Sequence, residues 1–276
     1  MPDNEVEEPR IKLYLHEEKR VVLIDLEEYI TGTVAAEMPA SFEVEALKAQ
    51  AVAARSYTLR RLQMAHKYES DCDMSDDVNE CQAYISRDAF EKQHGKTQNL
   101  WIKIAQVVED TRGEIMIYDG FPIDALYHST CGGRTESSLE AWHSNVPYLQ
   151  SVACEYCRDS AHYEELKTFS NADLIKVLGE SGPIKVVETT SSGRVKAMKI
   201  NKRRISGEEF RALLGLPSNW LSIKTNQTGI TVNSRGYGHG IGLCQNGSNG
   251  MAKTGAKYHD ILKNYYQGID FLKINY

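Results

Sequence analysis

Apolar and polar residues alternate near the amino-terminal end of the chain, in the manner of a sheet. Residues 11–15 and 21–24 predict two short strands, because apolar and β-branched side chains recur there. The charged residues 16–20 lie between them and predict the turn that joins them. The chain therefore is expected to begin with a β-hairpin.

A helix should follow the hairpin directly. Asp25 is its candidate N-cap, and Glu28 stands three residues later as a capping-box partner. An apolar stripe runs along the helix, and Glu37 lies on that stripe in the last turn. Pro39 predicts that the helix ends just before it, because the residue before a proline disfavours helical backbone angles.

A second, longer helix is predicted from about residue 42 to 65. Ser41 is its candidate N-cap, and the acidic residues Glu43 and Glu45 suit the positive end of the helix dipole. The core-facing stripe of this helix consists largely of alanine and other small residues. We therefore expect another element to pack closely against it.

The rest of the chain mixes strands and helices without a regular βαβ repeat. The polar, acidic residues 67–81 predict a loop. The other elements expected are a partial helix at 89–108, strands at 114–118, within 184–200, near 223 and at 230–232, and helices at 206–214 and 255–266. This mixture favours an α+β fold, in which helices and antiparallel strands surround one substrate cleft and residues 168–225 form a smaller lobe.

Composition and charge narrow the class of protein. The 276 residues correspond to about two domains or one large one, and 41% of them are hydrophobic, enough for a folded core. The net charge of −6 argues against nucleic acid as a partner, because phosphate binding needs a concentrated basic surface. No run approaches the roughly 18 apolar residues of a membrane-spanning helix. The acidic first residues have no apolar h-region, so no signal peptide is expected, and residues 1–10 are expected to be disordered or artificially added.

The six cysteines are too few for a disulfide scaffold, but their placement suggests two metal sites. One is a Cys₃His set made of the Cys154-x-x-Cys157 pair, Cys131 upstream and His162 downstream. The other consists of three residues around the acidic loop: His66, Cys72 and Cys81. Zinc, disulfides and reduced buried thiols all stay open for these residues.

Glu37 is the first candidate for catalysis. Its place on the apolar stripe and at the negative end of a helix should raise the pKa of its carboxyl group. A carboxylic acid that stays protonated near neutral pH is suited to general acid catalysis at a glycosidic oxygen. The alternative is a boundary glutamate paired with Lys48 or Arg55. These two cations are seven residues apart, hence on one helix face, where they could hold a carboxylate or a sugar substituent or form a solvated basic surface.

A second group of polar residues stands in the middle of the chain. The run YHSTCGGRTE begins with Tyr127, His128 and Ser129. Adjacent residues of a strand point to opposite faces, so His128 and Ser129 are poorly placed for a nucleophilic dyad, and no Gly-x-Ser-x-Gly elbow is present. A hydrolytic triad is therefore disfavoured.

A glycine-rich segment, RGYGHGIGLCQ at 235–245, lies near the carboxyl-terminal end. It lacks the third glycine of a dinucleotide loop and the Gly-Lys-Ser/Thr of a phosphate loop. Alternating glycines let a backbone approach a ligand closely, and Tyr237, His239 and Gln245 would then line one face suited to a sugar ring. The alternative is a tight glycine-rich turn.

Taken together, these runs resemble stage II sporulation protein D, a family of peptidoglycan lytic transglycosylases. The resemblance covers residues 11–272. It is carried by EYITGTVAAEMP at 28–39, FEVEALKAQAVAARSY at 42–57, LYHSTCGGRTE at 126–136, PYL at 147–149, GYGHGIGLCQNG at 236–247 and NGMA at 249–252.

The resemblance implies cleavage of the bond between N-acetylmuramic acid and N-acetylglucosamine in peptide-stripped glycan strands, leaving 1,6-anhydro ends. It assigns Glu37 as the single catalytic acid and then base, with no catalytic cofactor. It places eight residues along the cleft: Lys48, Arg55, Tyr127, His128, Ser129, Tyr237, His239 and Gln245. It further implies an extracytoplasmic protein, membrane-anchored at the sporulation septum, that works during engulfment with an amidase and other engulfment proteins.

Two departures from the family pattern stand out. Some members bind zinc through a His-x₅-Cys…His-Cys loop, which His66, Cys72 and Cys81 fit as a structural zinc site, but Glu80 stands where the second histidine would be. The resemblance also implies a membrane anchor, which we expect to lie outside this chain. Two other functions compete: a non-catalytic cell-wall module or amidase enhancer, and a zinc hydrolase that uses the Cys/His clusters.

Overall fold

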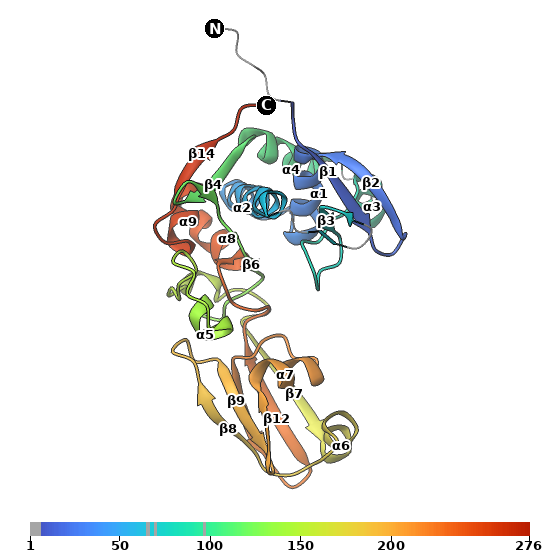
Figure 1. The fold of residues 1–276 in the computed structure, drawn as a ribbon. Helices are drawn as coiled ribbons and strands as arrows, with labels where there is room; N and C mark the ends of the chain where they lie inside the picture. Colours follow the sequence, from blue (N-terminus) through green and yellow to red (C-terminus); the bar gives the residue numbers. More distant parts are fainter. Residues whose placement is uncertain (1–6, 65–66, 69–70, 96–97) are drawn as a thin grey trace. The chain divides into compact units, whose positions relative to one another are not determined.

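The structure, a computed structural model, describes residues 7–64, 67–68, 71–95 and 98–276. The chain forms two compact units (Figure 1). The first contains the residues up to Leu126 together with Met251–Lys263 and Gly268–Tyr276, and the second contains Tyr127–Gly250 and Asn264–Gln267. Helices are mixed with mostly antiparallel sheets, which confirms the α+β fold class.

Helices form the centre of the first unit. They are α1 (Leu26–Glu37), α2 (Val44–Gln63), α3 (Arg87–His94) and α4 (Gln98–Asp110). The alanine-rich stretch of α2 packs against both α1 and α4, as its small side chains predict. Nearly every residue from Ala46 to Thr58 is buried, so α2 is enclosed on all sides rather than along one stripe. Its hydroxyl groups stay satisfied because Ser56 and Thr58 bond to carbonyls one turn back, at 2.6 and 2.8 Å.

The starts of these two helices differ from the predicted caps. Asp25 is the N-cap of α1, but its side chain makes no capping hydrogen bond and instead pairs with Arg10 at 3.2 Å. The capping box with Glu28 is therefore wrong. Helix α2 begins after Glu43 rather than after Ser41. Neither helix start has a side-chain capping hydrogen bond, and at α1 the ion pair with Arg10 takes its place.

Two three-stranded sheets flank the helices of the first unit. The first joins the predicted hairpin to a short third strand, in the order β2-β1-β3, and the second has the order β14-β4-β5. Their strands are β1 (Arg10–Leu15), β2 (Arg20–Asp25), β3 (Met74–Ser75), β4 (Glu114–Tyr118), β5 (Phe121–Pro122) and β14 (Asp270–Lys273). The hairpin and β4 confirm the prediction, whereas β3 lies within the predicted loop and β14 was not foreseen.

Two further sheets and two helices form most of the second unit. The sheets have the orders β10-β9-β8 and β11-β12-β7. The elements are β7 (Glu164–Ser170), α6 (Asn171–Leu178), β8 (Ile184–Thr189), β9 (Val195–Ile200), β10 (Arg203–Ser206), α7 (Gly207–Leu213), β11 (Leu221–Thr225) and β12 (Gly229–Arg235). Leu174, Met198, Phe210 and Val232 belong to their shared core. Serine side chains cap both helices, with a full capping box at Ser170 of α6.

The remainder of the second unit has little regular structure. It contains β6 (Tyr127–His128), α5 (Ser138–Trp142), the 3₁₀ turn η2 (Glu155–Cys157) and β13 (Leu243–Cys244). Residues 236–242 of the glycine-rich segment form no strand of their own before β13 begins, because Gly236, Gly238, Gly240 and Gly242 all have positive φ angles. The helices α8 (Gln245–Lys253) and α9 (Tyr258–Tyr265) each carry residues of both units.

Candidate functional site

Glu37 is the last residue of α1 and lies in the first unit. The helix stops where Pro39 predicts, since Met38 turns to extended backbone and its amide closes the last turn on Val34 at 3.0 Å. The Glu37 side chain is half-buried. Its Oε1 accepts a hydrogen bond of 2.8 Å from the backbone amide of Ala83. The carboxyl group is therefore held in one orientation rather than swinging in solvent.

The segment that supplies this amide, residues 82–85, lies across α1. Gly32 makes the close approach feasible, because a Cβ atom there would stand 2.3 Å from the Tyr84 ring and 2.7 Å from the Ile85 carbonyl. The Tyr84 ring stacks on Tyr29, with 5.8 Å between the ring centroids. The Gln82 side chain donates to Thr58 at 3.1 Å and anchors the segment from the other side. Gly32 and the buried side chains around it thus position Ala83 against Glu37.

A cavity of about 810 Å³ lies in the first unit, beside the β1–β2 hairpin. The hairpin, residues 76–79 and residues 83–86 line it, and so does Glu28 of α1. Ala83 therefore contributes its amide to Glu37 and its surface to this cavity. Glu37 itself is not among the lining residues.

Lys48 and Arg55 bind carboxylates other than Glu37. The Lys48 ammonium pairs with Asp110 at 2.8 Å and lowers the pKa of that partly exposed carboxyl group. Arg55 is fully buried, and its guanidinium binds both carboxylate oxygens of Glu27, at 2.9 and 2.7 Å. In this structure Arg55 does not reach a surface that a glycan could touch.

The Arg55–Glu27 pair is a structural hub of the first unit. Arg55 also donates to the carbonyl oxygen of Glu114 at 3.0 Å, and Glu27 also accepts from Gly113 N–H at 3.0 Å and from the Tyr276 hydroxyl at 2.6 Å. Burial opposes ionisation of Glu27, but the Arg55 charge and these donors outweigh it and hold the pKa of Glu27 below its ordinary value. The sequence pointed to Arg55 as a candidate residue but did not indicate that Glu27 is its partner.

In the second unit, the two motif segments that the sequence singled out run side by side. Strands β6 and β13 pair in parallel, with Tyr127 opposite Leu243 and His128 opposite Cys244. Thr130 and Tyr237 exchange both backbone hydrogen bonds, at 3.1 and 2.7 Å. The structure thus gathers Tyr127, His128, Ser129, Tyr237, His239 and Gln245 in this unit, whereas Glu37, Lys48 and Arg55 belong to the first.

The two histidines of this group both have lowered pKa values but differ in their hydrogen-bond partners. The Nε2 of His239 lies 2.9 Å from the Tyr127 carbonyl oxygen, and its Nδ1 accepts from Ile241 N–H at 3.1 Å. Burial lowers the pKa of His239 to about 4. Burial, with the neighbouring His239 and Arg194, also holds the pKa of His128 well below its ordinary value. The Nδ1 of His128 donates to the Ile241 carbonyl at 3.0 Å, while its buried Nε2 has no hydrogen-bond partner among the described residues.

The three side chains expected to share one face of the glycine-rich segment differ in exposure, because positive φ angles interrupt the strand alternation between residues 236 and 242. Tyr237 is 46% exposed, and its ring centroid lies 4.8 Å from that of His162. His239 is half-buried, and Gln245 is buried at the start of α8. The His239 side chain lines a pocket of about 310 Å³ together with Trp142. Trp142 is an exposed aromatic residue that the sequence analysis did not select as a candidate.

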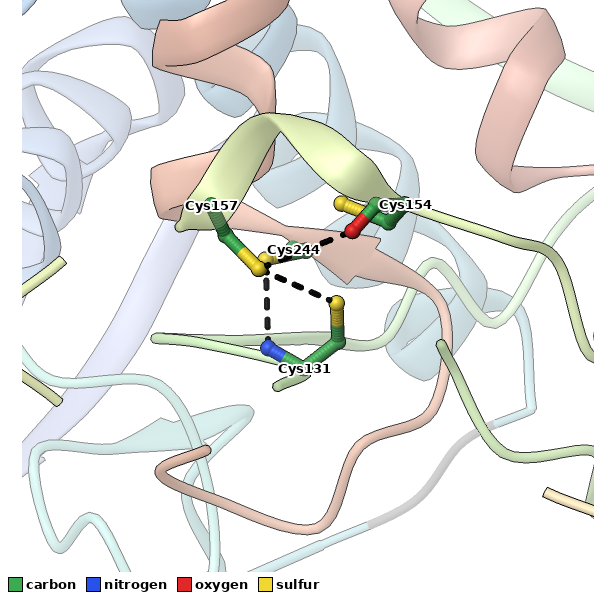
Figure 2. A group of neighbouring side chains, drawn as sticks. All are labelled: Cys131, Cys154, Cys157 and Cys244. Atoms are coloured by element: carbon green, nitrogen blue, oxygen red, sulfur yellow. Dashed lines mark hydrogen bonds between the residues drawn. The ribbon is translucent and has the colours of Figure 1, made fainter. Parts of the chain in front are cut away.

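Four buried cysteines cluster in the second unit: Cys131, Cys154, Cys157 and Cys244 (Figure 2). Their sulfur atoms all lie within 4.8 Å of one another, a spacing at which they could hold a metal ion. The Cys₃His prediction had three of these members right but was wrong about the fourth. His162 is exposed and lies against Tyr237, and Cys244 takes its place.

The other predicted metal site can be described only in part. His66 lies outside the described residues. Cys72 is buried and Cys81 half-buried, both in the first unit and neither in a disulfide. Among the residues that the structure describes, the four-cysteine cluster is the group whose ligand atoms come together.

Arg194 was missed by sequence reasoning and lies at the centre of the second unit. It is buried, and its guanidinium donates to the carbonyl oxygens of Cys131 and Arg134, both at 3.0 Å, and to the Ser192 hydroxyl at 2.9 Å. A Cβ atom on Gly240 would stand 2.4 Å from this guanidinium, so the glycine allows the loop to pass over it. One arginine among 32 basic residues carries no local signal of this role.

The fold and the site define a two-unit α+β protein with one oriented carboxyl group at a helix end and a buried cluster of four thiols. The family model described as "Stage II sporulation protein" matches residues 14–118. The chain is 39% identical to stage II sporulation protein D of Bacillus subtilis (strain 168) over 265 residues, which cover 94% of the chain and 77% of that protein. It is 37% identical to stage II sporulation protein D of Bacillus amyloliquefaciens over 269 residues, covering 94% and 78%. The chain belongs to the stage II sporulation protein D family.

A more distant relative is named for a different role. The chain is 29% identical to the amidase enhancer of Bacillus subtilis (strain 168) over 300 residues, covering 87% of the chain and 39% of that protein. Across the described residues, the structure contains no helix with the length and hydropathy of a membrane span.

Proposed function

We propose that the protein is a peptidoglycan lytic transglycosylase that uses Glu37 as its only catalytic carboxyl group. The observation that carries the proposal is the position of Glu37, half-buried at the end of α1 and oriented by the Ala83 amide. Membership of the stage II sporulation protein D family adds a role in sporulation. The substrate proposed is the glycan strand of peptidoglycan after its stem peptides have been removed.

One carboxyl group is sufficient for this reaction. The protonated Glu37 donates its proton to the glycosidic oxygen, and the bond from the muramic acid C1 to that oxygen breaks. The resulting carboxylate then removes the proton from the 6-hydroxyl of the same muramic acid, whose oxygen bonds to C1 and closes the 1,6-anhydro ring. Hydrolytic glycosidases need a second carboxylate to activate water or attack the sugar, and no water is consumed here.

The second unit would contribute glycan contacts. Tyr237 is exposed enough to stack on a sugar, and Trp142 and His239 line a hollow in the same unit. Because both ring nitrogens of His239 face backbone groups, we assign it a supporting role rather than proton transfer. Any zinc in the protein would be structural, since the proposed steps require only Glu37.

The setting proposed is the outer side of the sporulation septum, where wall remodelling accompanies engulfment. The names of the Bacillus relatives support sporulation, and the similarity to an amidase enhancer supports cell-wall enzymes as partners. An amidase that strips stem peptides would supply the bare glycan that this reaction consumes.

The first prediction tests Glu37 directly. Glu37→Gln keeps the size and the hydrogen bond from Ala83 but cannot cycle a proton, so release of 1,6-anhydro products from peptide-free glycan should fall by about 10²-fold or more. Mass spectrometry of the products gives the measurement. Binding to insoluble glycan should change little. Glu109→Gln, which removes an exposed carboxylate from the same unit, is the matched control and should leave turnover unchanged.

A non-catalytic role is the second candidate, and the amidase-enhancer relative favours it. In that case wild-type protein and Glu37→Gln would bind glycan equally and release no anhydro sugar, while both would increase product release by an added amidase. Equal turnover by wild type and Glu37→Gln would reject Glu37 as the catalytic acid.

A further inference from the structure

We propose that Cys131, Cys154, Cys157 and Cys244 bind one Zn²⁺ as four thiolates, and that this ion cross-links the irregular part of the second unit. The proposal is independent of the glycan chemistry. It also moves the expected zinc away from the loop that carries Cys72 and Cys81.

The sulfur positions suit a tetrahedral ion. Four thiolates at the usual zinc–sulfur distance of about 2.3 Å stand about 3.8 Å from one another. The four sulfur atoms here already lie within 4.8 Å, and Cys131 and Cys157 are 3.5 Å apart (Figure 2). The site is therefore completed if no sulfur–sulfur distance changes by more than about 1 Å, with the Cys131–Cys157 pair lengthening by about 0.3 Å, and the ligand set is typical of zinc.

Hydrogen-bond donors point at the sulfur atoms. The amides of Cys131 and Gly247 donate to the Cys244 sulfur at 3.3 and 3.2 Å. The Tyr265 hydroxyl lies 3.1 Å from the Cys154 sulfur. Buried thiols that only fill space need no such donors, whereas metal-bound thiolates commonly have them, because the donors spread the charge on sulfur.

The charge balance points the same way. Binding releases four thiol protons and leaves a buried group with a net charge of −2. Arg194 is buried beside this group, with its guanidinium 3.0 Å from the carbonyl oxygen of Cys131. In the described part of the chain it forms no direct ion pair and reaches the Glu136 carboxylate through the Ser192 hydroxyl. A tetrathiolate zinc centre adds negative charge on the side of Arg194 that faces Cys131, while the buried Glu136 carboxylate lies one hydroxyl group away on the other connection.

The ligands come from three segments that are joined by two-residue strands and scattered backbone hydrogen bonds rather than by a long sheet. Cys131 follows the two-residue β6, and Cys244 ends the two-residue β13. Cys154 is the N-cap of the three-residue η2, and Cys157 is its last residue. Such short elements provide few backbone hydrogen bonds. Because all four ligands are protein side chains, the ion has no open position for substrate, so its role is structural.

The experiment measures metal content and coordination in the full chain. The Cys72→Ser/Cys81→Ser double variant, expressed with zinc, should hold about one zinc per chain by elemental analysis. X-ray absorption at the zinc edge should show four sulfur neighbours at about 2.3 Å and no nitrogen. Because this variant retains the whole cluster, the result does not depend on whether cluster variants fold.

Cluster variants provide the second measurement. Cys157→Ser and Cys244→Ser should each weaken zinc binding by at least about tenfold, in line with the loss of one ligand. In the wild type, a chelator should accelerate amide hydrogen exchange in residues 127–157 and 236–247 while α2 of the first unit stays protected. Four results would overturn the proposal: no zinc in the double variant, iron in its place, a nitrogen ligand, or a mass lower by four hydrogens that shows two disulfides.

Discussion

The two units bury an arginine each, and the two arginines stabilise their surroundings in different ways. In the first unit Arg55 binds a carboxylate, Glu27, inside a packed group of helices. In the second, Arg194 binds two backbone carbonyls and a hydroxyl inside a region of loops. The first arginine joins elements that already have their own hydrogen bonds. The second supplies hydrogen bonds to a backbone that has no regular partner.

The difference shows what replaces secondary structure when it is sparse. The helices of the first unit satisfy most of their own backbone groups, so its buried arginine is free to bind mainly a carboxylate, with the Glu114 carbonyl as a further partner. The irregular segments of the second unit must find partners for their carbonyls elsewhere, and Arg194, the glycine turns and the four thiols lie where those segments meet. The candidate catalytic acid stands in the more regular unit.

Removing the first arginine should have the largest effect on stability. Arg55→Met leaves Glu27 buried without its countercharge, so the free energy of unfolding should fall by about 3–5 kcal/mol. Chemical denaturation measures the loss, and hydrogen exchange should locate it in α1, α2 and β4. Arg87→Met, which breaks an exposed pair with Glu91, is the matched control and should cost less than about 1 kcal/mol.

A variant that removes both charges sharpens this test. Glu27→Gln/Arg55→Met should recover part of the loss, because no charge is then left unpaired in the core. A double variant as unstable as Arg55→Met alone would mean that Arg55 acts mainly through the carbonyls it contacts, as Arg194 does, and the comparison between the units would fail.

The second arginine should have a somewhat smaller effect, confined to the other unit. Arg194→Met leaves the carbonyls of Cys131 and Arg134 without their donor, at a cost of about 2–4 kcal/mol. Hydrogen exchange should rise in residues 127–157 and little in α2. The exposed Arg204, paired with Glu188, provides the matched control as Arg204→Met. Exchange that rises equally in both units would contradict the separation.

The smallest difference that we expect between the two units is in how their stability changes as the pH falls. The pKa of His239 is lowered from 6.5 to about 4, with burial as the main cause and the charges of Arg211 and Arg194 adding to it. The unfolded chain therefore binds more protons than the folded one between these pH values, and the second unit loses stability as pH falls through that window. The partial exposure of His239 keeps the effect modest.

The first unit should respond only at lower pH. Since Glu27 has a pKa below 4.5 in the folded state, its contribution is complete above that pH and is lost as pH falls through the lower folded value. Hydrogen exchange across an acid titration should show the second unit loosening first. His239→Gln removes one of the two histidines whose pKa values are lowered in the second unit, so it should narrow the gap in part. Simultaneous loosening of both units in the wild type would refute the order.

Local patterns predicted much of the fold. The hairpin, the end of α1 before Pro39 and strand β4 were predicted correctly, because alternation, proline sterics and β-branched runs act within a few residues. The failures lie where distant contacts decide. The capping box at Asp25 gave way to the pair with Arg10. Between Gly236 and Gly242, four positive φ angles favour the glycine-rich turn over the shared face of Tyr237, His239 and Gln245.

The candidate site also has some features that local sequence patterns predicted and others that depend on distant contacts. Glu37 at the end of a helix could be read from the sequence, but the Ala83 amide that orients it comes from a segment 46 residues away. The Cys154–Cys157 spacing was visible, whereas Cys244 joins its partner Cys131 across 113 residues. No periodicity relates positions so far apart, since their meeting depends on how whole segments pack.

The sequence alone determined the family, the α+β class, the helix that ends at Glu37 and the residue types available for chemistry, because these depend on short-range sterics and on motifs. The tertiary structure decided the partners: Arg55 with Glu27, Cys244 with the other three thiols, and Ala83 with Glu37. Burial is the physical reason. A charge, thiol or carboxyl group removed from water must find a complement, and only the packed chain specifies which group is within reach.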